Sequence, residues 1–434
     1  MSEHKTATIW HPFTQMKSDT EPIHISIGDG IYLTDKQGNR IIDAISSWWV
    51  NIHGHANPVI AAAIYEQAMR LEHVLFAGFT HDPAIKLADQ LAELLPGGLN
   101  NIFYSDNGST AVEVALKLAC QYYYNRGFQP RNRFIAFQNA YHGDTIGAMS
   151  AGGRGTFTMP FRELLFHTDY IDYPSTWIGD TGVEQKEEMS LAHLEKLLAE
   201  HESRYAAIII EPLVQGAGGM NMCRPEFLKK IRAVCDEYDT LLIFDEVMTG
   251  FGRTGHWFAS TGSGVRPDLI CLSKGITGGF MPLSATVATK EIYEAFYSDD
   301  RNKTFFHGHS YTANPLACAA AVASIGLLRN NPLQFTGMAQ KHEKYAGYLM
   351  QMEQVVKFRI CGTIAAWQVK TGGESGYMNK IAPVLRKKFL DKGILIRPLG
   401  NTLYLMPPYI ITDEELEGIY KVIPEVLSSL DLKF

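Results

Sequence analysis

Residues 241–246 read LLIFDE and residues 269–275 read LICLSKG, and these two stretches decide the fold. Each is a short apolar run that ends in polar residues. Continuous apolar runs of this length are typical of strands that are buried on both faces of a parallel sheet. Residues 102–104, 133–137 and 206–210 have the same character and alternate with helical patterns. The sequence therefore predicts an α/β fold in which helices cover both faces of a mostly parallel sheet.

The length of the chain, 434 residues, predicts two or three domains. We expect a large domain over residues 48–330 and a smaller α+β domain over residues 331–434, where amphipathic helices replace the alternating pattern. Residues 1–47 contain a hairpin-like pair of apolar segments around residues 36–39. This N-terminal segment is expected to join the smaller domain.

Composition excludes several classes of protein. The 39 Lys and Arg residues and 46 Asp and Glu residues give a net charge of −7, which argues against a nucleic-acid binder. The longest nearly apolar stretch, residues 316–328, is too short to span a bilayer, so no membrane partner is expected. Six scattered cysteines predict reduced core residues and a cytoplasmic location. The His-Gly-His segments at residues 53–55 and 307–309 lack other ligands at zinc-site spacing, so no metal site is predicted.

Polar segments that follow the apolar runs are the first candidates for a binding site, because ligands of such sheets bind beyond the carboxyl ends of the strands. The segment at residues 105–110 contains Gly108 and Ser109, and a helix is expected to open there with Thr110-x-x-Glu113. Helix N-terminal amides and hydroxyls suit a phosphate. A capped helix without a ligand explains this segment equally well.

Lys274 and Asp245 each follow one of the two deciding runs, and Glu211 follows a third. A lysine at the buried mouth of a parallel sheet is partly desolvated, which lowers its pKa and makes the amine nucleophilic. Asp245 could form a buried ion pair with Lys274, or could hold a cationic group of a ligand. A phosphate site, an amine and a carboxylate for a ring nitrogen together fit pyridoxal phosphate.

A competing motif is the sequence GFGRTG at residues 250–255, which matches the dinucleotide-binding pattern of dehydrogenases. Five residues, 245–249, separate it from the preceding strand, and turn-like residues rather than a clear helix follow it. This context argues against a dehydrogenase. A catalytically silent protein that binds pyridoxal phosphate is a further alternative.

With their surroundings, these sites resemble the class III (ω-amino) aminotransferases, which are pyridoxal-phosphate enzymes of fold type I. The resemblance runs in family order over nearly the whole chain. It rests on residues 10–16, 46–49, 107–109, 141–145, 211–219, 245–246, 249–255, 273–275, 307–310, 397–400 and 404–409.

The resemblance implies a role for each matching residue. Lys274 and Asp245 would be catalytic, with Lys274 bound to the cofactor aldehyde and Asp245 keeping the ring nitrogen protonated. Phosphate would be held by Gly108 and Ser109 of one subunit and by His309 and Ser310 of the other, so a homodimer is implied. Tyr141 would line the cofactor and substrate sites. The expected substrate contacts are Phe13, Trp48, Tyr141, Lys274, Gly308 and Arg397.

Within the family, the segments around Trp48 and Arg397 resemble members that transfer an amino group from S-adenosylmethionine to 8-amino-7-oxononanoate in biotin synthesis. Two departures affect the choice of donor. Phe13 stands where many members have tyrosine, and His309-Ser310 replaces a common Pro-Thr pair. Lysine as the donor, or a class III enzyme of the ornithine or 4-aminobutyrate type, remains the alternative.

Overall fold

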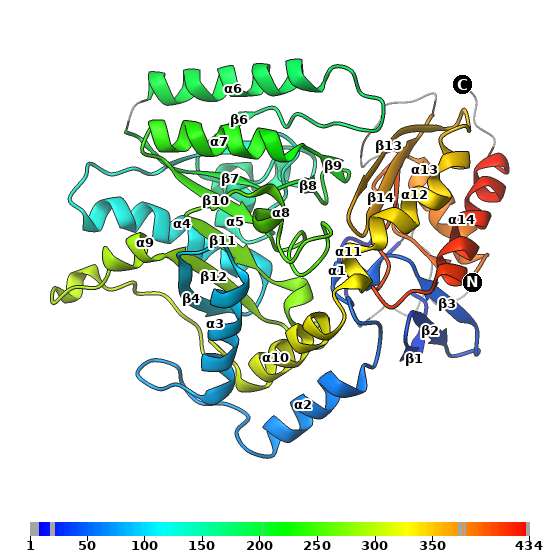
Figure 1. Cartoon of the computed structure of the whole chain (residues 1–434), viewed down its shortest axis with the longest axis horizontal. Helices are drawn as coiled ribbons and strands as arrows, with labels where there is room; N and C mark the ends of the chain where they lie inside the picture. The colour runs from blue at the N-terminus through cyan, green and yellow to red at the C-terminus, as the bar shows by residue number, and fades with distance from the viewer. Residues whose placement is uncertain (1–7, 18–21, 202, 372–375, 377–378, 431–434) are drawn as a thin grey trace.

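A seven-stranded sheet forms the centre of the larger part of the molecule (Figure 1). The computed structural model describes residues 8–17, 22–201, 203–371, 376 and 379–430. The strands occur in the order β4 (Leu99–Ser105), β12 (Ser284–Thr289), β11 (Leu269–Leu272), β10 (Leu241–Asp245), β7 (Tyr205–Ile210), β5 (Arg133–Phe137) and β6 (Thr168–Ile171). Only β12 runs antiparallel to its neighbours, whereas the other pairings are parallel. The predicted mostly parallel sheet is therefore confirmed.

Both faces of this sheet are buried, which explains the continuous apolar runs. In β10, Leu242 and Phe244 enter one core and Ile243 enters the other. The first core is covered mainly by α3 (Asp82–Leu94), α6 (Val183–Glu200), α7 (Pro225–Glu237) and α10 (Pro315–Asn330), and the second mainly by α4 (Gly108–Asn125) and α5 (Ile146–Ala151). Since successive side chains of a strand point to opposite faces, each run needs apolar residues at every position.

A third core lies in the smaller part of the molecule, to the right in Figure 1. It is built on the antiparallel sheet β13 (Val355–Cys361), β14 (Ile364–Val369) and β16 (Thr402–Leu405) and on helices α12 (Met338–Leu349), α13 (Ile381–Leu390) and α14 (Asp413–Ser428). The N-terminal strands β1 (Ile25–Asp29), β2 (Tyr32–Asp35) and β3 (Arg40–Asp43) join it, because β3 pairs with β15 (Ile394–Leu395). The domain boundaries themselves stay a prediction.

The remaining elements are short or lie around these cores. They are α1 (Ser46–Trp49), α2 (Pro58–Ala68), η1 (Met159–Leu164), β8 (Val214–Gln215), β9 (Asn221–Met222), α8 (Ala259–Ser263), η2 (Lys274–Thr277), α9 (Lys290–Glu294), η3 (Arg301–Lys303) and α11 (Leu333–Thr336). Among the described helices, none is both long enough and apolar enough to cross a membrane.

Candidate active site

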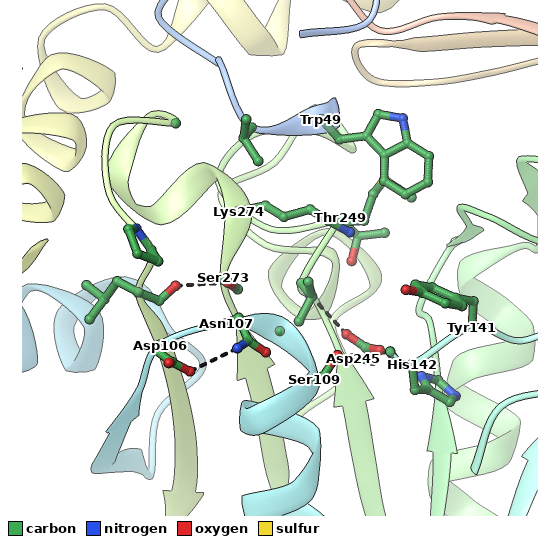
Figure 2. Close-up of a pocket in the computed structure, with 18 of the residues that line it drawn as sticks. Trp49, Asp106, Asn107, Ser109, Tyr141, His142, Asp245, Thr249, Ser273 and Lys274 are labelled. Atoms are coloured by element: carbon green, nitrogen blue, oxygen red, sulfur yellow. Dashed lines mark hydrogen bonds and ion pairs between the residues drawn. The ribbon is translucent and has the colours of Figure 1, made fainter. Parts of the chain in front are cut away.

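The polar segments that follow the strands meet in one cavity of about 490 Å³ (Figure 2). Asp245 reaches it from the end of β10, Lys274 from the turn after β11, and Glu211 from the residue after β7. Asn107, Gly108 and Ser109 line it at the start of α4. The parallel direction of these strands places their carboxyl ends at the same edge of the sheet, as expected for a ligand site of this fold.

The expected Thr110-x-x-Glu113 opening is wrong, because the N-cap of α4 lies three residues earlier, 110 − 107 = 3. The N-cap is Asn107, whose side chain accepts a hydrogen bond from the backbone N–H of Thr110 at 3.1 Å. The Glu113 carboxylate instead accepts from the N–H groups of Gly147 and Ala148. Because Gly108 and Ser109 are the first helical residues, their unpaired amides face the cavity.

Close packing explains why position 108 is a glycine. A Cβ atom at this position would lie 2.6 Å from Cγ1 of Val247. The hydroxyl of Ser109 accepts a hydrogen bond from the N–H of Asp144 at 3.2 Å, which leaves its own proton available for a ligand. The helix start therefore combines close backbone approach, a free hydroxyl donor and the positive end of a helix dipole.

Asp245 is held in place by a buried histidine. Oδ2 of Asp245 lies 2.7 Å from Nδ1 of His142, and Oδ1 accepts from the N–H of Val247 at 3.1 Å. Burial alone would lower the pKa of His142, but the hydrogen bond and the negative charge of Asp245 raise the pKa above its ordinary value. His142 is therefore favoured in its protonated form next to the carboxylate.

Lys274 lies at the floor of the cavity in a strained backbone conformation, with φ at +46°. Its Nζ atom lies 4.6 Å from the centre of the Trp49 ring (Figure 2). Burial lowers the pKa of Lys274 to about 8, although the charges of Asp245 and Glu211 act in the opposite direction. A positive φ angle costs free energy in a residue other than glycine, and such strained conformations cluster at functional sites. The site thus presents a partly neutral amine at physiological pH.

We expect the Lys274 amine of the cofactor-free enzyme to react with acetic anhydride with a midpoint near pH 8. Only the neutral amine is nucleophilic, so the rate should fall below this pH and level off above it. Brief labelling across a pH series, followed by mass spectrometry of the Lys274 peptide, measures the midpoint. An exposed lysine of the same digest gives the reference rate. A midpoint at the ordinary lysine value of 10.5 would contradict the expectation.

Two buried glutamates next to the site differ in their tasks. The Glu211 carboxylate accepts from the N–H groups of Tyr141 and Gly216 at 3.1 and 2.9 Å, and so fixes two loops of the cavity. Glu246 points away and accepts from the N–H groups of Ala259 and Ser260 at the start of α8. Burial raises the pKa of each to about 7. Of the two, only Glu211 lines the cavity.

A larger neighbouring cavity of about 1450 Å³ is lined by all of the expected substrate contacts except Gly308. It shares Trp49, Tyr141 and Lys274 with the first cavity. The guanidinium carbon of Arg397 lies 3.9 Å from the centre of the Trp48 ring and 5.8 Å from that of Phe13. The aromatic rings of Phe13 and Trp48 meet edge to face, with centres 5.6 Å apart. Arg397 and the rings of Phe13 and Trp48 thus form one wall of a cavity that extends to Lys274.

Gly308, His309 and Ser310 line neither of these cavities. They lie in a segment next to α4, where Nδ1 of His307 is 2.9 Å from Nζ of Lys117. Nε2 of His309 is buried and has no hydrogen-bond partner within the described residues. The expected roles of His309 and Ser310 in a partner's phosphate site and of Gly308 in substrate contact therefore stay predictions. No group of three or more potential metal ligands occurs in the part of the chain that the structure describes.

Sequence reasoning missed His142 and Trp49 as functional residues, and it did not assign Arg253 of the GFGRTG segment. Arg253 is 1% exposed and donates hydrogen bonds to the carbonyl oxygens of Trp49 and Pro407. A signal for Trp49 was its place next to Trp48, whereas His142 carried a signal only through its place beside Tyr141 in the family segment. The glycine-rich segment at residues 250–255 forms turns and lines neither cavity.

Comparison with known proteins agrees with this geometry. The family model for class III aminotransferases matches residues 13–427. The chain therefore belongs to the class III aminotransferase family, and the dehydrogenase alternative is wrong.

Individual relatives indicate which members of the family this chain is similar to. The adenosylmethionine-8-amino-7-oxononanoate aminotransferase of Synechococcus elongatus is 52% identical over 422 residues, which cover 97% of this chain and 99% of that relative. The crystal structure of the enzyme of the same name from Methanocaldococcus jannaschii matches with a TM-score of 0.91 at 35% identity and covers 98% of both chains. An amine transaminase from an uncultivated Pseudomonas species, solved in its PLP-bound form, matches with a TM-score of 0.89 at 30% identity, over 97% of this chain and 98% of that one.

Proposed function

We propose that the 490 Å³ cavity binds pyridoxal phosphate. The residues present fit this group. Gly108 and Ser109 offer amides and a free hydroxyl for the phosphate, Asp245 offers a carboxylate for the ring nitrogen, and Lys274 offers an amine for the aldehyde. The hydroxyls of Ser105 and Thr249 are buried without a partner within the described residues. When bound, the cofactor supplies an aldehyde and a ring that accepts electrons from the substrate.

The side chains divide the work of transamination. Nζ of Lys274 is placed to accept a proton from the carbon that carries the donor's amino group, and would donate it to the aldehyde carbon of the bound cofactor. Its lowered pKa makes both directions accessible near neutral pH. Asp245, supported by His142, holds a proton at the ring nitrogen. The ring of Trp49 packs against Lys274 and leaves it only partly exposed.

We further propose that the amino acceptor is 8-amino-7-oxononanoate and that S-adenosylmethionine is the donor. The observation that carries this proposal is the Arg397 guanidinium, 3.9 Å from the Trp48 ring, in the cavity that opens toward Lys274. Arg397 would pair with the carboxylate of the acceptor while Trp48 and Phe13 cover its alkyl chain. The names of the relatives support the same pair of substrates.

The proposed unit is a homodimer in which Gly308, His309 and Ser310 complete the partner's site. Exposed aromatic side chains on the same segment support a subunit contact, because Phe306 is 69% exposed and Tyr311 is 65% exposed. Large exposed apolar side chains next to one another mark interaction sites.

A coupled assay tests the substrates directly. Purified enzyme loaded with pyridoxal phosphate is offered 8-amino-7-oxononanoate with S-adenosylmethionine or with lysine, and the diamine product is quantified by mass spectrometry. We expect turnover with S-adenosylmethionine. Turnover with lysine but not with S-adenosylmethionine would contradict the proposed donor. Lysine is tested because Phe13 and His309-Ser310 depart from the common pattern. Activity with neither donor, together with turnover of ornithine or 4-aminobutyrate, would overturn the acceptor.

A further inference from the structure

Asp43 is a buried carboxylate that lies outside both cavities. It ends β3, and its side chain is 0% exposed. Oδ2 accepts hydrogen bonds from the N–H of Ser47 at 2.6 Å, from the Ser47 hydroxyl at 3.1 Å and from Nε2 of His55 at 2.9 Å. Oδ1 accepts from the N–H of Ile45 at 3.2 Å. Burial of a carboxylate is costly unless its oxygens are satisfied, and here one short turn and one imidazole satisfy them.

The imidazole of His55 is itself fixed in orientation. Nδ2 of Asn51 lies 3.3 Å from Nδ1 of His55. An amide nitrogen can only donate, so Nδ1 accepts and Nε2 carries the proton that is donated to Asp43. The backbone N–H of His55 donates to the carbonyl of Gly30 at 2.7 Å. The Asp43–His55 pair therefore ties residues 45–47 to the N-terminal sheet.

The turn that Asp43 holds is strained. Ser46, Ser47 and Trp49 have φ angles of +50°, +58° and +70°. Such left-handed conformations cost about 1–3 kcal/mol each in residues other than glycine and persist only where the surroundings enforce them. The enforcing contacts are the carboxylate of Asp43 and a hydrogen bond from the Ser46 hydroxyl to the carbonyl of Met406 at 2.8 Å.

This strained turn directs the side chains of the adjacent residues Trp48 and Trp49 into different surroundings. Trp48 is 37% exposed and lies against Arg397 in the larger cavity. Trp49 is 4% exposed, donates from Nε1 to the Tyr404 hydroxyl at 3.0 Å and lies beneath Nζ of Lys274. One turn therefore fixes the positions of both rings. Trp48 forms part of the wall of the expected acceptor pocket, and Trp49 packs against Lys274.

We propose that Asp43, oriented by His55, is a positioning residue for the amino acceptor, because it enforces the turn that places Trp48 against Arg397. This inference rests on the proposed function of the larger cavity. Asp43 does not touch the acceptor and acts through Trp48. Loss of its carboxylate lets the turn relax toward an unstrained conformation, which moves the Trp48 ring away from the guanidinium.

The test compares Asp43→Ala and Asp43→Asn with the matched control Asp35→Asn. Asp35 also accepts backbone hydrogen bonds within a turn of the N-terminal sheet, from Gln37 and Asn39, but it has no link to a tryptophan. Two readouts are measured on the holoenzyme. They are the KM and kcat for 8-amino-7-oxononanoate, and the Kd of nonanoate, a carboxylate of the same chain length, by titration calorimetry.

For Asp43→Ala we expect KM and Kd to rise about tenfold each while kcat changes less than about threefold. In Asp43→Asn an amide NH₂ group replaces one carboxylate oxygen, so two hydrogen-bond donors face each other where the oxygen accepted a bond. We expect KM and Kd to rise about threefold each in this variant. Asp35→Asn should leave both values unchanged. Circular dichroism confirms that each variant is folded, and Asp43→Asn decides if the alanine variant does not fold.

KM and Kd within about twofold of the wild-type values in a folded Asp43 variant would overturn the inference, as would an equal rise in Asp35→Asn. Failure of the proposed function looks different, because the wild-type enzyme would then not turn over 8-amino-7-oxononanoate. The Kd of nonanoate would still decide the role of Asp43. A wild-type enzyme that neither binds nonanoate nor turns over the acceptor would overturn both.

Discussion

Replacement of Lys274 by alanine is expected to lower kcat/KM for transamination by at least about 10⁴-fold, the upper end of what a positioned proton-transfer group supplies. The variant loses the amine that anchors the cofactor aldehyde and the base that moves the proton of the donor. Among the residues that the structure describes, the only other lysine that lines either cavity is Lys380, in the larger one. Half-reaction kinetics with S-adenosylmethionine, followed by the absorbance of the bound cofactor, measure the loss.

The control separates chemistry from stability. Lys274→Met removes the amine but keeps the length of the side chain. Because the pKa of Lys274 is lowered to about 8 from 10.5, its protonated form is disfavoured in the folded protein, and this penalty is present below pH 8. The cofactor-free Lys274→Met variant should therefore melt at the wild-type temperature or above it at pH 7. A large drop in melting temperature, or activity within about tenfold of wild type, would contradict the assigned role.

The sequence was sufficient to predict the sheet and the position of the site. The runs at β7, β10 and β11 are apolar on both faces, and such runs occur in parallel sheets that helices cover. Since parallel strands end at one edge, Glu211, Asp245 and Lys274 could be placed together without knowledge of any distance. The antiparallel strand β12 was not singled out, because its sequence SATVAT contains three hydroxyl side chains that are buried all the same.

The details of the site could not be predicted because they depend on contacts between distant segments. His142 bonds to Asp245 across 103 positions, and Trp49 packs against Lys274 although 274 − 49 = 225 positions separate them. Asp245 and Glu246 are adjacent and chemically alike, yet only the first faces the cavity, since successive side chains at a strand end point in opposite directions. The cap of α4 was misplaced by the same limit, because Thr110-x-x-Glu113 matches a capping pattern while Glu113 bonds to α5.

Replacement of Asp245 by asparagine is expected to lower kcat by about 10²- to 10³-fold, the range that follows removal of one preorganised electrostatic partner. The amide keeps the size of the side chain and can still accept from the N–H of Val247, but it carries no charge to hold a proton at the ring nitrogen. His142 also loses the charge that raises its pKa, so it should become neutral at a lower pH than in the wild type. Single-turnover kinetics measure the loss of rate, and NMR titration of His142 in the cofactor-free protein measures the pKa.

Asp268→Asn provides the matched control for this prediction. Asp268 precedes β11 at the opposite end of the same sheet, where its carboxylate accepts from Arg232 and from the N–H of Leu242, each at 2.7 Å. Loss of this half-buried ion pair should lower the melting temperature without a comparable change in kcat. Asp268 lies at the other end of the strands from the cavity, so its loss should not disturb the reacting groups. Equal losses of kcat in the two variants would show that Asp245 supports the sheet and not the reaction. A lower pKa of His142 in Asp245→Asn alone would show that the carboxylate and the imidazole act as one unit at the ring nitrogen.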